Sequence, residues 1–195
     1  NIGHDHTDGV GSWRQAIAGE KVGIVKPGST FVCGETDPAL RPLFEATEAA
    51  ATWWRGEDFD CEQEILALGG RAVTLRTPSG TVHDVFVPLH GEHQSQNAAV
   101  ALAAVEAFFH RPLDPDVVAE GFAAVQMPGR FEVVGREPTV ILDAAHNADG
   151  ARACAETLRE EFTLGGTIVM VAGFLEGRDP VEMLDALGAA DAGLL

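Results

Sequence analysis

The spacing of apolar residues changes several times along the chain, and each change marks a different element. Helical spacing, with Ser12 and Asp114 placed as N-caps, predicts helices over residues 12–24, 37–50, 92–109 and 114–125. A short apolar run predicts a strand over 30–33, and two strand-like runs over 72–76 and 81–87 predict an antiparallel hairpin. The first part of the chain is therefore expected to be of the α/β type.

A break containing Pro and Gly at 126–130 is followed by a more regular pattern, so we place a domain boundary between residues 127 and 128. Beyond it, strands are predicted over 139–142 and 167–172, helices over 148–162 and 180–187, and the start of a third strand at Leu194. Strands that alternate with helices predict a parallel sheet, which binds ligands at the carboxyl ends of its strands. The expected domains are 1–127 and 128–195.

The composition is that of an acidic chain with enough apolar residues for a core. Of its 195 residues 46% are apolar, and 13 basic against 30 acidic residues give a formal net charge of −17. This charge argues against nucleic acid or a membrane surface as a partner, since both need a basic patch. No apolar run approaches the roughly 20 residues of a membrane span. The three cysteines lie far apart, so we expect a cytoplasmic protein without a disulfide framework.

Both ends of the sequence are unusual for a complete protein. The chain starts at Asn1 rather than at a Met, and it stops at Leu195, where a strand would begin. We therefore expect a piece of a longer protein.

Two polar clusters near the N-terminus could carry chemistry. The run His4–Asp8 contains two histidines and two aspartates, which could bind a divalent metal, although polar loops often have this composition. Lys21 lies near the end of the first predicted helix, between Glu20 and Val22. It is either an ordinary exposed lysine or a partly buried one, whose neutral amine could react.

Further polar residues gather where a helix begins and where the break lies. Gln94 and Asn97 stand at the start of an Ala-rich helix, where free N–H groups favour an anion or a nucleotide, but ordinary capping explains them equally well. Arg130 in the break could bind phosphate through its planar guanidinium, or it could form a surface ion pair.

The predicted strand ends of the second domain carry the remaining candidates. Asp143 and His146 follow the strand 139–142, at the place where α/β sheets hold their ligands. Arg178 and Asp179 follow the strand 167–172 and could face the same crevice.

Together, these motifs resemble the folylpolyglutamate synthase/dihydrofolate synthase family, the folate branch of the Mur ligase superfamily. The motifs occur in the family's order: D-H-T-D at 5–8, E-K-x-G-I at 20–24, H-Q-x-x-N-A at 93–98, P-G-R-F-E at 128–132 and D-x-A-H-N at 143–147. The resemblance implies part of a Mur-ligase-type central ATPase domain followed by the first half of a Rossmann-like C-terminal domain.

The resemblance also implies a role for each motif of the first domain. His6 would be a ligand of Mg²⁺. Lys21 would be carbamylated and take part in catalysis. Asn97 would lie near the adenine of ATP.

In the second domain, Arg130 would reach the ATP phosphates, while Asp143 and His146 would reach the ribose and phosphate side of the same nucleotide. Arg130 and His146 would also take part in catalysis. The implied reaction is ATP-dependent ligation of L-glutamate to the carboxylate of folate or dihydropteroate through an acyl phosphate. The implied cofactors are ATP and Mg²⁺, and the implied oligomeric state is a monomer.

The sequence departs from the family pattern at several positions. The Gly-rich P-loop, G-x-x-G-K-[ST], does not occur in these residues, so the piece is expected to be inactive by itself. Ala148 replaces the usual proline after A-H-N, and Arg178-Asp179 stands where the family has Lys-Asp. Two alternatives stay open: another Mur-superfamily amide ligase of the cell-wall or cyanophycin type, and a non-catalytic nucleotide- or metal-binding module.

Overall fold

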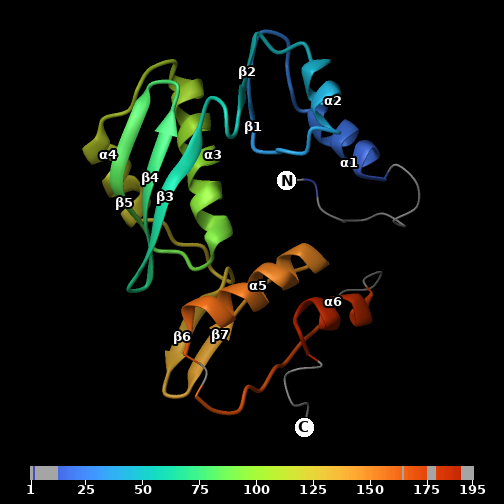
Figure 1. Cartoon of the computed structure of the whole chain (residues 1–195), viewed down its shortest axis with the longest axis vertical. Helices are drawn as coiled ribbons and strands as arrows, with labels where there is room; N and C mark the ends of the chain where they lie inside the picture. The colour runs from blue at the N-terminus through green and yellow to red at the C-terminus, as the bar shows by residue number, and fades with distance from the viewer. Residues whose placement is uncertain (1, 3–12, 164, 175–178, 190–195) are drawn as a thin grey trace.

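The chain folds into three groups of helices and strands (Figure 1). The computed structural model describes residues 2, 13–163, 165–174 and 179–189. Its helices are α1 (Trp13–Val22), α2 (Arg41–Glu45), α3 (Glu92–Phe109), α4 (Pro115–Ala123), α5 (Ala148–Glu161) and α6 (Pro180–Ala186). Its strands are β1 (Thr30–Cys33), β2 (Ala51–Trp54), β3 (Asp60–Ala67), β4 (Gly70–Thr77), β5 (Gly80–Val87), β6 (Glu132–Arg136) and β7 (Thr139–Leu142).

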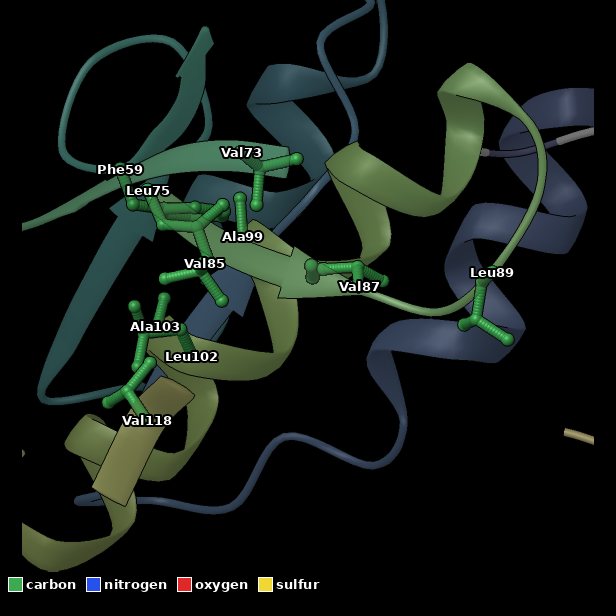
Figure 2. Close-up of a cluster of buried hydrophobic side chains, with 11 residues drawn as sticks. Phe59, Val73, Leu75, Val85, Val87, Leu89, Ala99, Leu102, Ala103 and Val118 are labelled. Atoms are coloured by element: carbon green, nitrogen blue, oxygen red, sulfur yellow. The ribbon is translucent and has the colours of Figure 1, made fainter. Parts of the chain in front are cut away.

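The main core lies between an antiparallel sheet, β3–β4–β5, and the helices α3 and α4. The predicted hairpin is confirmed as β4 and β5, with Arg71 paired to Val87. Figure 2 shows the apolar side chains of this core, in which Leu75 and Val85 from the sheet and Leu102 from α3 are buried. Each such side chain contributes about 1.5–3 kcal/mol by leaving water. The core therefore fixes the position of α3, which carries one of the candidate motifs.

Only one of the two strands of a second, smaller sheet was predicted. β1 pairs in parallel with β2, which the sequence pattern did not predict, and α3 contacts β1 as well as the antiparallel sheet. The predicted helix over 37–50 is wrong in its extent, because only 41–45 are helical. Ala50 donates its N–H to the carbonyl of Ser29 at 2.8 Å, so the chain turns back there and places β2 beside β1.

The second half of the chain departs most from the expected sheet. β7 is confirmed with its predicted bounds, but it pairs antiparallel with β6, which was not predicted. The predicted strand over 167–172 is wrong, since these residues have no regular structure and Val171 is 95% exposed. A strand needs a hydrogen-bonded neighbour to satisfy its backbone groups, and no described strand pairs with this segment. The strand expected from Leu194 lies outside the described residues.

The helices predicted over 92–109, 114–125, 148–162 and 180–187 are present. The helix at 92–109 has the predicted bounds, and Asp114 accepts a hydrogen bond from the N–H of Asp116 at the start of α4. Asn147 and Asp179 cap α5 and α6 in the same way, by accepting N–H groups of the first turn. None of the helices in the described ranges is long and apolar enough to cross a membrane.

Candidate nucleotide site

A cavity of about 380 Å³ lies where β1 and β2 end, and residues of α1 and α3 line it as well. Lys21 from α1 and Asn97 from α3 both line it, although they are 76 positions apart in the sequence. The fold therefore brings together one residue from the E-K-x-G-I motif and one from the H-Q-x-x-N-A motif.

Lys21 is an exposed lysine near the end of α1. Its side chain is 64% exposed, and its Nζ lies 3.6 Å from Oε1 of Glu20. Of the two alternatives left open by the sequence, the structure therefore agrees with the exposed lysine, since α1 ends one residue later and no further turn of the helix covers it. Lys21 thus stands at the rim of the cavity rather than inside it.

Two charged residues of the cavity were missed in the sequence pattern. Glu35 follows β1, and Arg55 follows β2. Arg55 donates from Nη1 to Oε1 of Gln96 in α3 at 3.1 Å. Both residues stand at the carboxyl ends of parallel strands, where α/β folds place ligand groups. The signal that could have found Arg55 was the run Thr52–Trp54, whose β-branched and aromatic residues favour a strand.

The first turn of α3 is held in a defined geometry. Asn97 donates to Oε1 of the buried Gln94 at 3.1 Å. Gly91, directly before the helix, has a φ of 99°, and a Cβ there would lie 2.5 Å from the His93 ring and 2.7 Å from the Thr157 hydroxyl. Only glycine allows both this backbone conformation and the close approach of α5. The start of α3 therefore lies against the second half of the chain.

The second-half candidates meet at the carboxyl end of β7. The Asp143 carboxylate accepts the N–H of Phe131 at 2.8 Å and that of Ala145 at 2.7 Å. Arg130 donates from Nη1 to the carbonyl of Ala144 at 3.4 Å, and Nδ1 of His146 lies 3.3 Å from the same oxygen. Arg130, Asp143 and His146 thus form one loop cluster, in which Asp143 ties the P-G-R-F-E segment to the end of the strand.

His93 lies at the start of α3, close to the second half of the chain. It lines the cavity that Lys21 and Asn97 border. Burial lowers the pKa of His93, and the nearby Asp143 carboxylate opposes this shift without outweighing it. The His90 ring, just before α3, lies 5.7 Å from the ring of Phe131, which adjoins Arg130, so the start of α3 lies against the second half of the chain.

Some predicted ligands lie outside the described residues. These are the run His4–Asp8, with the proposed metal ligand His6, and Arg178. Within the ranges that the structure describes, no group of three or more His, Cys, Asp and Glu side chains could hold a metal ion. Asp179 caps α6 and so has a structural partner.

The Asp143→Ala substitution is expected to lower the free energy of unfolding by about 2 kcal/mol, because two backbone N–H groups lose a charged acceptor. Urea denaturation of the chain measures this loss. Glu160→Ala, which removes an exposed carboxylate of the same half, is the control and should change the value by less than about 0.5 kcal/mol. Equal urea midpoints for Asp143→Ala and the unsubstituted chain would contradict the bracing role of Asp143.

Comparison with known proteins places the chain in context. Residues 129–193 match the family described as Mur ligase, glutamate ligase domain. The dihydrofolate synthase/folylpolyglutamate synthase of Mycobacterium tuberculosis is 41% identical over 95% of this chain and 41% of its own length. The chain thus spans about two fifths of the length of this curated relative.

Solved structures agree with this match. The Mycobacterium tuberculosis folylpolyglutamate synthase complexed with ADP has a TM-score of 0.77 and 42% identity, over 83% of this chain and 38% of its own. An FPGS–AMPPCP–folate complex has a TM-score of 0.85 and 30% identity, over 97% of this chain and 47% of its own. Over nearly its whole length, the chain is therefore similar to the folylpolyglutamate synthase/dihydrofolate synthase family of Mur ligases.

Proposed function

We propose that the full-length protein containing this chain ligates L-glutamate to a carboxylate of folate or dihydropteroate at the expense of ATP. One observation carries the proposal: the start of α3 lies against the loop that carries Arg130, because the His90 ring is 5.7 Å from the Phe131 ring and the N–H of Gly91 donates to Glu161 of α5. A nucleotide bound between them would contact both halves of the chain. The relatives add support, because one of them was solved with ADP and another with AMPPCP and folate.

Each candidate residue has a distinct task in the proposed complex. Asn97 presents an amide to the adenine, and amides can pair donor and acceptor with a base edge. Arg130 binds the phosphates, since its planar guanidinium fits their oxygens and is exposed on the loop. His146 lies beside Arg130 and contacts the ribose and phosphate side, while Asp143 holds the loop that presents both.

The proposed chemistry has two steps. The folate carboxylate attacks the γ-phosphorus and releases ADP, which gives an acyl phosphate. The amine of glutamate then attacks the carbonyl carbon, and phosphate leaves with one oxygen of the original carboxylate. The protein contributes positioning and charge stabilisation, so Arg130 and His146 act by fixing the phosphates in line.

Lys21 is the proposed catalytic residue at the rim of the cavity that Asn97 also lines. Its neutral amine would combine with CO₂ and release a proton, giving a carbamate that places a negative charge at the cavity rim. Mg²⁺, with His6 as a proposed ligand, would neutralise phosphate charge when bound. The proposed working form is a monomer.

The test is an assay of the full-length protein with labelled glutamate and ATP, with dihydropteroate in one arm and a reduced folate in the other. The expected result is a glutamylated product in at least one arm that disappears when ATP is omitted. ATP-dependent ligation of another acid, with no folate product, would instead favour the cell-wall or cyanophycin type of ligase. Nucleotide binding without any ligation would favour the binding module.

A further inference from the structure

The two halves of the chain are joined at a buried carboxylate that has no role in the proposed chemistry. Glu161, the last residue of α5, has a side chain that is only 1% exposed. We call its surroundings the Glu161 junction, which comprises Arg71, His90, Gly91, Phe131, Glu161 and Phe162.

Glu161 uses both carboxylate oxygens across the junction. Its Oε1 accepts from Nη2 of Arg71 at 2.7 Å and from the N–H of Gly91 at 2.7 Å, and its Oε2 lies 2.7 Å from Nδ1 of His90. Burial alone would raise the pKa of Glu161, but the hydrogen bonds from His90 and Arg71 outweigh it and hold the pKa below its ordinary value. The carboxylate is therefore charged, and it is bound to β4 and to the residues just before α3.

An aromatic cluster extends the junction toward the loop that carries Arg130. The His90 ring lies 5.7 Å from the Phe131 ring and 5.2 Å from the Phe162 ring, and the two Phe rings are 5.4 Å apart. Phe131 is buried and has a φ of 46°, a conformation that costs a non-glycine residue on the order of 1 kcal/mol or more. Its packing holds this conformation and fixes the direction of the adjacent Arg130.

Glu161 lies between the residues proposed to bind the nucleotide, which are Asn97 on one side and Arg130 and His146 on the other. Gly91 leads directly into α3, which carries Asn97. At the other end of α5, the helix starts two residues after His146. A rotation of α5 about the junction would therefore move His146 and Arg130 relative to Asn97.

We propose that Glu161 is a positioning residue: by holding the end of α5 against Arg71 and the start of α3, it sets the spacing between Asn97 and Arg130 and thereby the affinity for the adenine nucleotide. This inference rests on the proposed function for its ligand. Without the junction, only a fraction of the molecules have the two halves ordered before the nucleotide binds. The apparent Kd then equals the intrinsic Kd divided by that fraction, so the affinity falls.

The experiment compares Glu161→Gln with Glu64→Gln in the full-length protein, using calorimetric titration with ADP and the kinetics of ATP. Glu64 is the matched control, because its carboxylate lies 3.3 Å from the same Arg71 but belongs to the same sheet. Glu161→Gln should raise the Kd for ADP and the KM for ATP by about tenfold, with kcat within about threefold. Glu64→Gln should leave all three values unchanged.

A purely structural role would give a different result. Wild-type ADP affinity in Glu161→Gln, or an equal loss in Glu64→Gln, would overturn the proposal. Small-angle X-ray scattering of this chain provides a second readout without nucleotide: Glu161→Gln should give a larger radius of gyration, and an unchanged one would overturn the proposal. If the unsubstituted full-length protein does not bind ADP, the proposed function fails, and the scattering result alone decides on the junction.

Discussion

Lys21→Ala in the full-length protein is expected to lower the rate of glutamate ligation by about 10³-fold, the size of effect seen when a group that stabilises transition-state charge is removed. Lys21 borders the cavity that Asn97 also lines, where α1 approaches the two parallel strands. The measurement is the rate of labelled glutamate incorporation at saturating ATP. Formate or acetate should restore part of the rate, because a small carboxylate can stand in for the carbamate.

The companion variants separate the carbamate from the lysine's own positive charge. Lys21→Arg keeps a cation but cannot form a carbamate under these conditions, so it should be as inactive as Lys21→Ala. Lys26→Ala removes an exposed lysine from the following turn and should leave the rate unchanged. Unimpaired ligation by Lys21→Ala would show that this residue takes no part in the reaction.

Arg130→Ala is expected to lower kcat/KM for ATP by about 10²-fold with little change in stability. Its guanidinium donates to the carbonyl of Ala144 at the long distance of 3.4 Å, and the residue is exposed, so the fold loses little. The substitution removes a cation that can form bidentate hydrogen bonds with the phosphates, and this loss accounts for the kinetic effect. Steady-state kinetics with ATP as the varied substrate, together with a urea midpoint, measures both quantities.

Two further variants test whether the planar shape of the Arg130 guanidinium matters in addition to its charge. Arg130→Lys should recover only part of the loss, because an ammonium cannot make the paired hydrogen bonds of a guanidinium. Arg136→Ala, at an exposed position on β6, is the control and should behave like the unsubstituted protein. Parallel losses of stability and kcat/KM in Arg130→Ala would instead indicate a structural residue.

The parts of the fold that follow from local chemistry could be predicted from the sequence. The helix at 92–109 is a long Ala-rich run, and Asp114 and Asn147 mark helix starts through their own hydrogen bonds. β2 was missed because its four residues acquire a strand partner only when the chain turns back onto β1. Val169 is 77% exposed in a segment whose apolar pattern favours a strand, and no described strand pairs with this segment to complete a sheet.

The site could be predicted as motifs but not as geometry. The H-Q-x-x-N-A and D-x-A-H-N motifs, together with the other motifs in the same order, indicate Asn97, Asp143 and His146 as candidates. The hydrogen bond from Phe131 to Asp143 could not be predicted, because these two residues become neighbours only after β6 and β7 pair, whereas the bond from Ala145 is local. Glu161 carries no motif at all, and its importance arises from contacts with residues 70 and 90 positions away.

The most direct test of the central claim is an isotope-transfer experiment on the full-length protein. The carboxylate of the folate substrate is labelled with ¹⁸O, and the inorganic phosphate formed during ligation is analysed by mass spectrometry. An acyl phosphate requires that one labelled oxygen appears in phosphate for each amide bond formed. Unlabelled phosphate, or AMP and pyrophosphate in place of ADP and phosphate, would contradict the proposed mechanism.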